Sequence, residues 1–128
     1  MIIGIGTDVV DVPRIQHSFD EYGERFLHRV FTNTEIEYCE GFGETRFLHY
    51  AARFAAKEAF SKAIGTGMRQ GMAFKLVGIK NEVTGLPHIE LFGAMLEQWG
   101  SHIIHVTLSH TASVGLAVVV IETRSSNV

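Results

Sequence analysis

The sequence lacks the features of a secreted or membrane-bound chain. It has a single cysteine, Cys39, among 128 residues, so no disulfide can form within the chain. The apolar opening, residues 1–6, has no basic leader, and Asp8 follows it closely. This opening predicts neither a signal peptide nor a membrane span. We therefore expect a protein of the reducing cytoplasm.

A large excess of charge of either sign is also missing. The formal net charge is −3 with histidine neutral, so no overall basic charge points to nucleic-acid binding. Apolar residues make up 46% and charged residues 20% of the chain, a composition that is typical of globular proteins and excludes intrinsic disorder. Because repeats, low-complexity stretches and linkers are absent, residues 1–128 are expected to form one domain with a sizeable core.

The first part of the chain predicts a strand and then a helix. Residues 2–10 contain β-branched side chains and two glycines, a pattern typical of a strand. Pro13 then fits the first turn of a helix. Apolar residues recur every three or four positions along this helix, at Ile15, Phe19, Tyr22, Phe26 and Val30. Gly23 is expected to break or bend it.

Two further helices are expected before the midpoint of the chain. Thr32 and Glu35 have the spacing of a capping box, in which each side chain bonds the other residue's amide, and they predict a short helix. The strongest helical pattern covers residues 46–64, where six alanines accompany three phenylalanines. Gly65 and Gly67 end this helix.

The second half of the chain is mainly extended. Turn residues and alternating apolar positions predict one short helix and four strands. The strands are expected at residues 74–80, 87–92, 103–109 and 114–122, and the helix at residues 93–99. The apolar run 118–121 is typical of a central, buried strand. The fold class predicted is therefore α+β, with helices packed over a mainly antiparallel sheet.

Two acids and a lysine are the first candidates for chemistry. Asp8 lies in an apolar strand, where a carboxylate must be exposed at an edge, hydrogen-bonded or bound to a cation. Glu58 and Lys62 are four residues apart on the alanine-rich helix, a spacing that also describes a solvated ion pair. Magnesium prefers few carboxylates, several waters and phosphate oxygens, so Asp8 and Glu58 would suit phosphoryl transfer. Their spacing alone does not show that they meet.

Several other side chains could bind phosphate. Arg53 lies on the same helix as Lys62 but on a different face. His105 and His110 lie on or just after one strand, with Ser109 beside the second histidine. A strand histidine is more often structural or simply exposed, and no pair has the spacing of a metal site. Adjacent strand residues point to opposite faces, which argues against a catalytic Ser109–His110 unit.

Three arginines flank the first helical stripe. Arg14, Arg25 and Arg29 could form an ordinary solvated face. They could equally form a docking surface that attracts an acidic partner by its charge. The sequence pattern leaves both interpretations open.

The motifs together resemble the holo-acyl-carrier-protein synthase group of 4′-phosphopantetheinyl transferases. The strongest match is RFAAKEAFSKA at residues 53–63, followed by GTG at residues 65–67. Weaker matches are GIGTDVV at 4–10, Arg14-Ile15, FTNTE at 31–35, GLP at 85–87 and LSHT at 108–111. The likeness covers nearly the whole chain, and the helix motif is the specific part of it.

This resemblance implies a function and a set of site residues. It implies a cytoplasmic enzyme of fatty acid biosynthesis that moves 4′-phosphopantetheine from coenzyme A to a serine of apo-acyl carrier protein, releasing 3′,5′-ADP. It implies that Asp8 and Glu58 hold Mg²⁺ and that Lys62 lies near the pyrophosphate. Candidate coenzyme A contacts are Arg53, Gly65, His105 and Ser109. Arg14, Arg25 and Arg29 would face the acidic carrier protein.

The resemblance also implies a homotrimer with active sites between subunits. The group that accepts the serine proton stays open at this point: Glu35, directly or through water, is one hypothesis, and a magnesium-bound hydroxide is another. The family often has a lysine in the Gly-x-Pro turn, where this chain has Leu86, so one phosphate contact is expected to be missing or supplied elsewhere.

Two other functions are weighed against this one. A nuclease of the ribonuclease H type also carries a glycine-rich first strand with an aspartate, but it needs an early β-hairpin and several clustered carboxylates. A non-enzymatic nucleotide-binding or scaffold module would use only the surface for an acidic partner. Such a module has no need for Asp8, Glu58 and Lys62 together.

Overall fold

The structure is a computed structural model that describes residues 1–69 and 72–124. The elements are β1 (Ile2–Asp11), α1 (Val12–Tyr22), α2 (Glu24–Val30), α3 (Asn33–Glu40), η1 (Gly43–Thr45), α4 (Arg46–Ala63), η2 (Phe74–Leu76), β2 (Val77–Asn81), β3 (Pro87–Leu91), α5 (Gly93–Trp99), β4 (Ile103–His110) and β5 (Val114–Glu122). No helix within the described ranges is long and apolar enough to cross a membrane. The order of elements confirms the α+β class.

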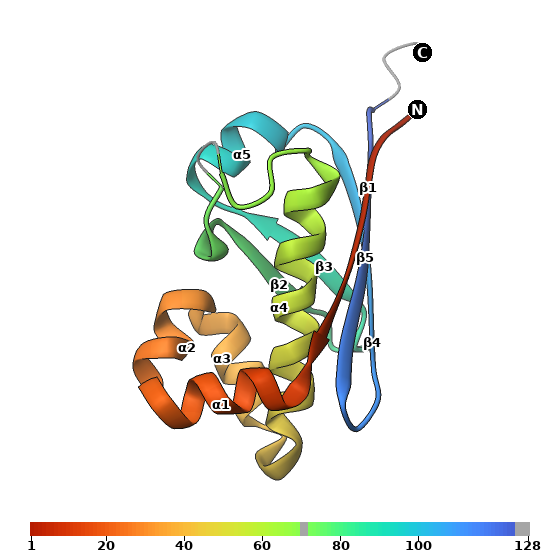
Figure 1. Ribbon diagram of the computed structural model, residues 1–128. Coiled ribbons are helices and arrows are strands. Elements are labelled where there is room, and N and C mark those ends of the chain that lie inside the picture. The colour runs from red at the N-terminus through yellow and green to blue at the C-terminus, as the bar shows by residue number, and fades with distance from the viewer. Residues whose placement is uncertain (70–71, 125–128) are drawn as a thin grey trace.

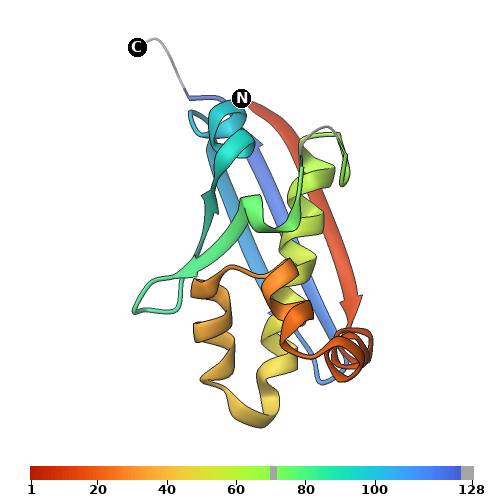
Figure 2. The same cartoon turned by 90° about the vertical axis from the view of Figure 1, so that its left-hand side faces the viewer.

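An antiparallel sheet of three strands, in the order β1-β5-β4, forms one layer of the molecule. Figure 1 shows this sheet nearly edge-on with α4 along one face, and Figure 2 shows α4 in front of the strands. β5 is the central strand, as the run 118–121 predicts. Only alternate residues of β5 are buried, however, because helices cover just one face of the sheet. The prediction of a central, buried strand is therefore confirmed for its central position, and in the single chain its fully buried side chains lie on the face toward α4.

Glycines and alanines allow α4 to lie very close to β1. A Cβ atom on Gly6 would overlap the carbonyl oxygen of Ala59, and one on Gly4 would overlap that of Ala63. Small side chains on both elements therefore set the short distance between helix and strand. Asp8 follows the two glycines on the same face of β1, because alternate strand residues share a face. The close approach thus brings Asp8 against the last turns of α4.

The N-terminal helices follow the predicted pattern. Gly23 separates α1 from α2. Its φ angle of 63° is one that residues with a side chain rarely adopt. The capping box at the start of α3 is present: the Glu35 amide donates to Thr32 Oγ1 at 3.2 Å, and the Thr32 amide donates to Glu35 Oε1 at 2.8 Å. The bounds of α4 agree with the helix expected at residues 46–64.

The remaining strands form a second sheet. β2 and β3 pair with each other in antiparallel register, from Val77 opposite Leu91 to Asn81 opposite Pro87. Residues 74–76, which were expected to begin a strand, form the 3₁₀ turn η2 instead. The sequence pattern could not show that the strands divide into two sheets, since each strand's alternation describes only its own faces.

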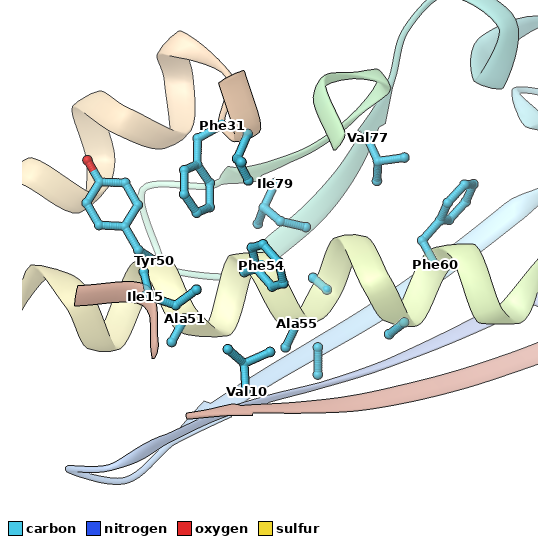
Figure 3. Packing of buried hydrophobic residues seen from close by; sticks show 14 of the residues in the cluster. Val10, Ile15, Phe31, Tyr50, Ala51, Phe54, Ala55, Phe60, Val77 and Ile79 are labelled. Carbon is cyan, nitrogen blue, oxygen red and sulfur yellow. The ribbon is translucent and has the colours of Figure 1, made fainter. Parts of the chain in front are cut away.

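The core lies on both sides of α4. Figure 3 shows Val10 of β1 below the helix, and Phe31 and Ile79 above it. Phe31 and Tyr50 are fully buried and their rings are 4.8 Å apart. Because the helix is buried along most of its length, even charged residues of α4 can face the interior. The side chains on different sides of α4 therefore have different surroundings.

Candidate active site

Asp8 and Lys62 form an ion pair at the edge between β1 and α4. Lys62 Nζ donates to Asp8 Oδ1 at 3.0 Å and to the carbonyl oxygen of Thr7 at 3.1 Å. The side chains of Lys62 and Asp8 are 53% and 20% exposed, so both remain open to solvent or to a ligand. The structure thus brings together two of the residues that the sequence predicts for the site.

Glu58 completes the group, one helical turn before Lys62. Burial raises the pKa of the Glu58 carboxyl, and the nearby Asp8 carboxylate raises it further, whereas Arg14 and Lys62 oppose this shift. Arg14 itself lies over the Phe54 ring, 5.4 Å from its centroid. Two acids therefore lie close enough to repel each other, and two cations surround them.

This donor set fits a hard divalent cation. Two carboxylates at a partly exposed edge leave room for water and phosphate oxygens, which magnesium requires in addition to protein ligands. The mutual repulsion that raises the Glu58 pKa would be relieved by a bound cation. Within the described ranges, no group of three or more histidine, cysteine or acidic residues gathers as a metal site. The remaining ligands of a metal here would therefore come from solvent and substrate.

The end of α4 presents backbone rather than side chains beside Lys62. Gly65 and Gly67 have φ 84° and 61°, and a Cβ on either residue would meet no atom of the described residues within 4 Å. The Gly65 amide donates to Lys62 O at 3.0 Å, and the Gly67 amide donates to Ser61 O at 3.1 Å. These hydrogen bonds hold the turn against the end of the helix. The space on the side of each glycine where a Cβ would lie is free of described atoms.

Arg53 lies in a different pocket, on the other side of α4. Its side chain is only 2% exposed, yet no carboxylate in the described part of the chain forms an ion pair with it. One terminal nitrogen donates to Asn81 Oδ1 at 2.7 Å and the other to His49 O at 3.2 Å, while its Nε has no hydrogen-bond partner among residues 1–69 and 72–124. A buried guanidinium without an acid is a strong site for an anion.

The pocket around Arg53 measures about 190 Å³, and its lining includes Tyr38, His49, Gly85, Pro87 and His110. Burial lowers the pKa of His49 to about 4, and the neighbouring Arg53 and His110 add to this effect. The Gly-x-Pro turn thus supplies one wall of the pocket. Leu86, between the two turn residues, is exposed.

His105 and Ser109 lie apart from both groups. They belong to the face of β4 that points away from α4, in register with Val120 and Leu116 of β5. His105 Nε2 is 2.6 Å from Glu122 Oε1, and hydrogen bonding to this histidine lowers the pKa of Glu122. The histidine that joins Arg53 is therefore His110, which strand alternation puts on the opposite face from Ser109.

Two of the three predicted docking arginines share a hollow. Arg25 and Arg29 line a space of about 310 Å³ together with Ser18, Tyr22 and Phe26. Arg14 is not part of that lining and lies near Glu58 instead. The basic surface therefore runs from the α1–α2 hollow toward the acidic group at β1.

The hypothesis that Glu35 accepts the serine proton is corrected by the structure. Glu35 is 0% exposed and lies in the core. Its Oε1 accepts from Lys57 Nζ at 2.7 Å, and its Oε2 accepts from the Ile79 amide at 2.9 Å. No substrate hydroxyl can reach a carboxylate that is buried and bonded in this way, so Glu35 has a structural role.

Two residues near these sites were missed by sequence reasoning. Lys57, next to Glu58, is fully buried and bonds Glu35. His49 lines the Arg53 pocket from one turn earlier on α4. Helical spacing could have found His49, because residues four apart share a face. Nothing local distinguishes Lys57 from an exposed lysine.

Comparisons with known proteins agree with the geometry. The 4′-phosphopantetheinyl transferase superfamily profile matches residues 4–119. The holo-[acyl-carrier-protein] synthase of Solibacter usitatus is 43% identical over 125 residues, which cover 95% of this chain and 99% of that protein.

Solved structures resemble the whole chain as well. The holo-[acyl-carrier-protein] synthase of Neisseria meningitidis is 36% identical, with a TM-score of 0.85 over 96% of this chain and 100% of that one. The enzyme from Bacillus anthracis in complex with CoA (3′,5′-ADP) is 34% identical, with a TM-score of 0.82 over 97% and 99% of the two chains. The chain therefore belongs to the 4′-phosphopantetheinyl transferase superfamily, as a member of its holo-acyl-carrier-protein synthase group.

Proposed function

We propose that the protein transfers 4′-phosphopantetheine from coenzyme A to a serine of apo-acyl carrier protein, giving holo-acyl carrier protein and 3′,5′-ADP. The observation that carries this proposal is the meeting of Asp8, Glu58 and Lys62 at the edge of β1 and α4. The family membership and the coenzyme A-derived ligand of the Bacillus anthracis relative support the same reaction. An enzyme of this kind serves fatty acid biosynthesis in the cytoplasm.

The reaction exchanges one phosphorus–oxygen bond for another. The serine Oγ attacks the β-phosphorus, the new bond forms, and the bond to the bridging oxygen breaks so that 3′,5′-ADP leaves. Lys62, which is half exposed and reaches over the site, neutralises charge on the phosphate oxygens. Since Glu35 is in the core, we infer that the acceptor of the serine proton is not Glu35 but a water or hydroxide at this exposed edge.

Asp8 and Glu58 would hold Mg²⁺ in the reacting complex. A magnesium ion supplies charge neutralisation and orientation for phosphate oxygens. The repulsion between the two carboxylates and their partial exposure support this role. Removing the ion should leave the fold intact, because the carboxylates are not part of the core.

One coenzyme A molecule would contact two subunits. Arg53 and Lys62 are nine residues apart, which is half a rotation around the helix and a rise of about 13 Å. A ligand on a single chain could not easily touch both sides of α4. We therefore propose that Lys62 and Gly65 bind the pyrophosphate in one subunit while Arg53 and His110 of another bind the nucleotide end.

The outer face of the sheet is the surface for such assembly. Ile3, Ile5 and Val9 of β1 are 46%, 67% and 57% exposed and follow one another along this face. His105 and Ser109 of β4 share the face. Exposed apolar side chains that gather on one face are typical of a surface that another protein chain covers. We propose a homotrimer, and light scattering should give three times the 14.2 kDa of one chain, with Ile5→Glu reducing that mass.

The carrier protein would dock on the basic surface of α1 and α2. Arg25 and Arg29 surround an amphipathic hollow beside Tyr22 and Phe26. Arg14 continues the positive charge toward Glu58. Positive charge next to the reacting edge would attract an acidic carrier and orient its serine. Charge reversal of Arg25 should therefore weaken carrier binding and leave coenzyme A binding unchanged.

The test is an incubation of the purified protein with apo-acyl carrier protein, coenzyme A and magnesium, followed by intact mass spectrometry of the carrier. We expect the carrier to gain one phosphopantetheine, and we expect EDTA to abolish the gain. Glu58→Ala should abolish the gain as well, whereas its matched control Glu97→Ala, which removes an exposed acid of α5, should leave the gain unchanged. If the mass of an acyl carrier protein that is known to be in its apo form does not change, the proposed reaction is rejected.

A further inference from the structure

Lys57 occupies an unusual place for a lysine. Its side chain is 0% exposed, and its ammonium donates to Glu35 Oε1 at 2.7 Å, to Val77 O at 2.6 Å and to Phe74 O at 3.0 Å. All three hydrogens of the ammonium therefore have a partner. Burial lowers the pKa of Lys57, and the Glu35 carboxylate opposes that shift.

The two carbonyl oxygens that Lys57 bonds lie at the far end of the segment that follows α4. The near end of this segment begins beside Lys62, where the Gly65 and Gly67 amides bond the helix. The far end, at η2 and the start of β2, returns to the same helix through Lys57. Both described parts of this segment, residues 64–69 and 72–77, are thus bonded to α4, and the Met72 amide donates to Arg69 O at 3.1 Å between them.

An apolar side chain could fill the position of Lys57 but could not hold these carbonyl oxygens. Buried ion pairs are often replaced by packed apolar residues with little loss of stability. The particular contribution of Lys57 is therefore directional: it fixes where Phe74 and Val77 lie relative to Lys62. Glu35 serves a different purpose, because it stabilises the buried ammonium and joins Thr32 of the α3 cap to Ile79 of β2.

We propose that Lys57 is a positioning residue for coenzyme A, acting through the segment that carries Gly65 and Gly67. This inference rests on the proposed function, since it assumes that the pyrophosphate lies over these glycines beside Lys62. Lys57 touches no substrate. It holds the far end of the segment so that the open space over Gly65 keeps its shape.

The test compares Lys57→Met with Glu35→Gln. Both changes disrupt the buried ion pair, but only the first removes the bonds to Phe74 and Val77. We expect Lys57→Met to raise the KM for coenzyme A about tenfold, with the KM for the carrier protein within twofold of wild type. Glu35→Gln should keep both KM values within twofold, even though it lowers stability. If Lys57→Met does not fold, the double variant Lys57→Met/Glu35→Gln takes its place, because it leaves no lone buried carboxylate.

Amide hydrogen exchange without any ligand provides the second readout. Residues 64–69 should exchange about tenfold faster in Lys57→Met than in Glu35→Gln, measured at the same distance below each melting temperature. Equal KM values for coenzyme A in wild type and Lys57→Met, or an equal rise in both variants, would overturn the positioning role. Failure of the proposed function would look different, since wild type itself would then transfer nothing while the exchange difference could still be measured.

Discussion

Two lysines of α4 each form an ion pair with an acid from another element, and the two pairs differ in how far they are exposed to solvent. The Lys57–Glu35 pair is 2.7 Å long and both side chains are 0% exposed. The Lys62–Asp8 pair is 3.0 Å long, with side chains 53% and 20% exposed. The lysines are five residues apart, so they point to different sides of the helix. The same residue types serve the core on one side and the candidate chemistry on the other.

Burial explains the difference between the pairs. A buried charge must be matched by partners because water cannot reach it, and both members of the Lys57–Glu35 pair have several. The exposed pair is screened by solvent and contributes little to stability. Under the proposed function, Asp8 and Lys62 would exchange each other for a metal ion and phosphate oxygens, whereas Glu35 and Lys57 would stay paired in the core.

The largest expected effect comes from breaking the two pairs in the same way. Lys57→Met should lower the free energy of unfolding by about 3–5 kcal/mol, because it strands the Glu35 carboxylate in the core. Lys62→Met should change it by less than about 1 kcal/mol. Urea unfolding followed by circular dichroism measures both values. Similar losses for the two variants would contradict the division of α4 into a structural side and a chemical side.

A smaller effect is expected from separating the exposed pair from α4. Gly6→Ala would place a Cβ against the Ala59 carbonyl, so helix and strand must move apart at a cost of about 1–3 kcal/mol. Transfer activity should fall as well, because Asp8 would move away from Glu58 and Lys62. Thermal unfolding and carrier mass measure the two effects.

Gly41→Ala is the matched control for this glycine substitution. Gly41 has φ −64°, and its nearest neighbour to an added Cβ is the Tyr38 carbonyl oxygen at 3.3 Å. The Gly41→Ala substitution should change the free energy of unfolding by no more than about 0.5 kcal/mol. Full activity in Gly6→Ala would show that the close approach of β1 to α4 is not needed for the site.

The effect that is smallest at neutral pH is the protonation of His49 on the Arg53 side of the helix, because it develops only as the pH falls below 6.5. The pKa of His49 is about 4 in the folded protein and 6.5 ordinarily, so the folded state favours the neutral ring. Its contribution to stability is complete above pH 6.5 and is lost as the pH falls toward 4. Urea unfolding across this window should show a steeper loss in wild type than in His49→Gln. Parallel curves would contradict the lowered pKa.

The sequence could predict what depends on local pattern. The capping box of Thr32 and Glu35, the break at Gly23 and the long alanine-rich helix all follow from residues that are close in the chain. The family motif also identified Asp8, Glu58 and Lys62, and the structure brings these three together. Fixed periods put each residue on one face of its own helix or strand, but the meeting of Asp8 with Glu58 and Lys62 was expected only from the family resemblance.

Tertiary partners could not be predicted in the same way. Glu35 has the correct spacing for a cap, but spacing does not reveal that the rest of its carboxylate meets Lys57 and Ile79. Strand alternation separates His105 from His110, but it does not say which face of β4 turns toward Arg53. The division of the strands into two sheets was missed for the same reason, since pairing depends on distant parts of the chain.

The most direct test compares the turnover of two variants, Glu58→Gln and Glu35→Gln, in which the same change neutralises one acid. Glu58→Gln should reduce phosphopantetheine transfer about 100- to 1000-fold, as expected for loss of an electrostatic group at the reacting centre, with a melting temperature near that of wild type. Glu35→Gln should show the reverse, with a lower melting temperature and turnover of the folded protein within a few-fold of wild type. Near-normal transfer by Glu58→Gln, or its abolition in folded Glu35→Gln, would contradict the account.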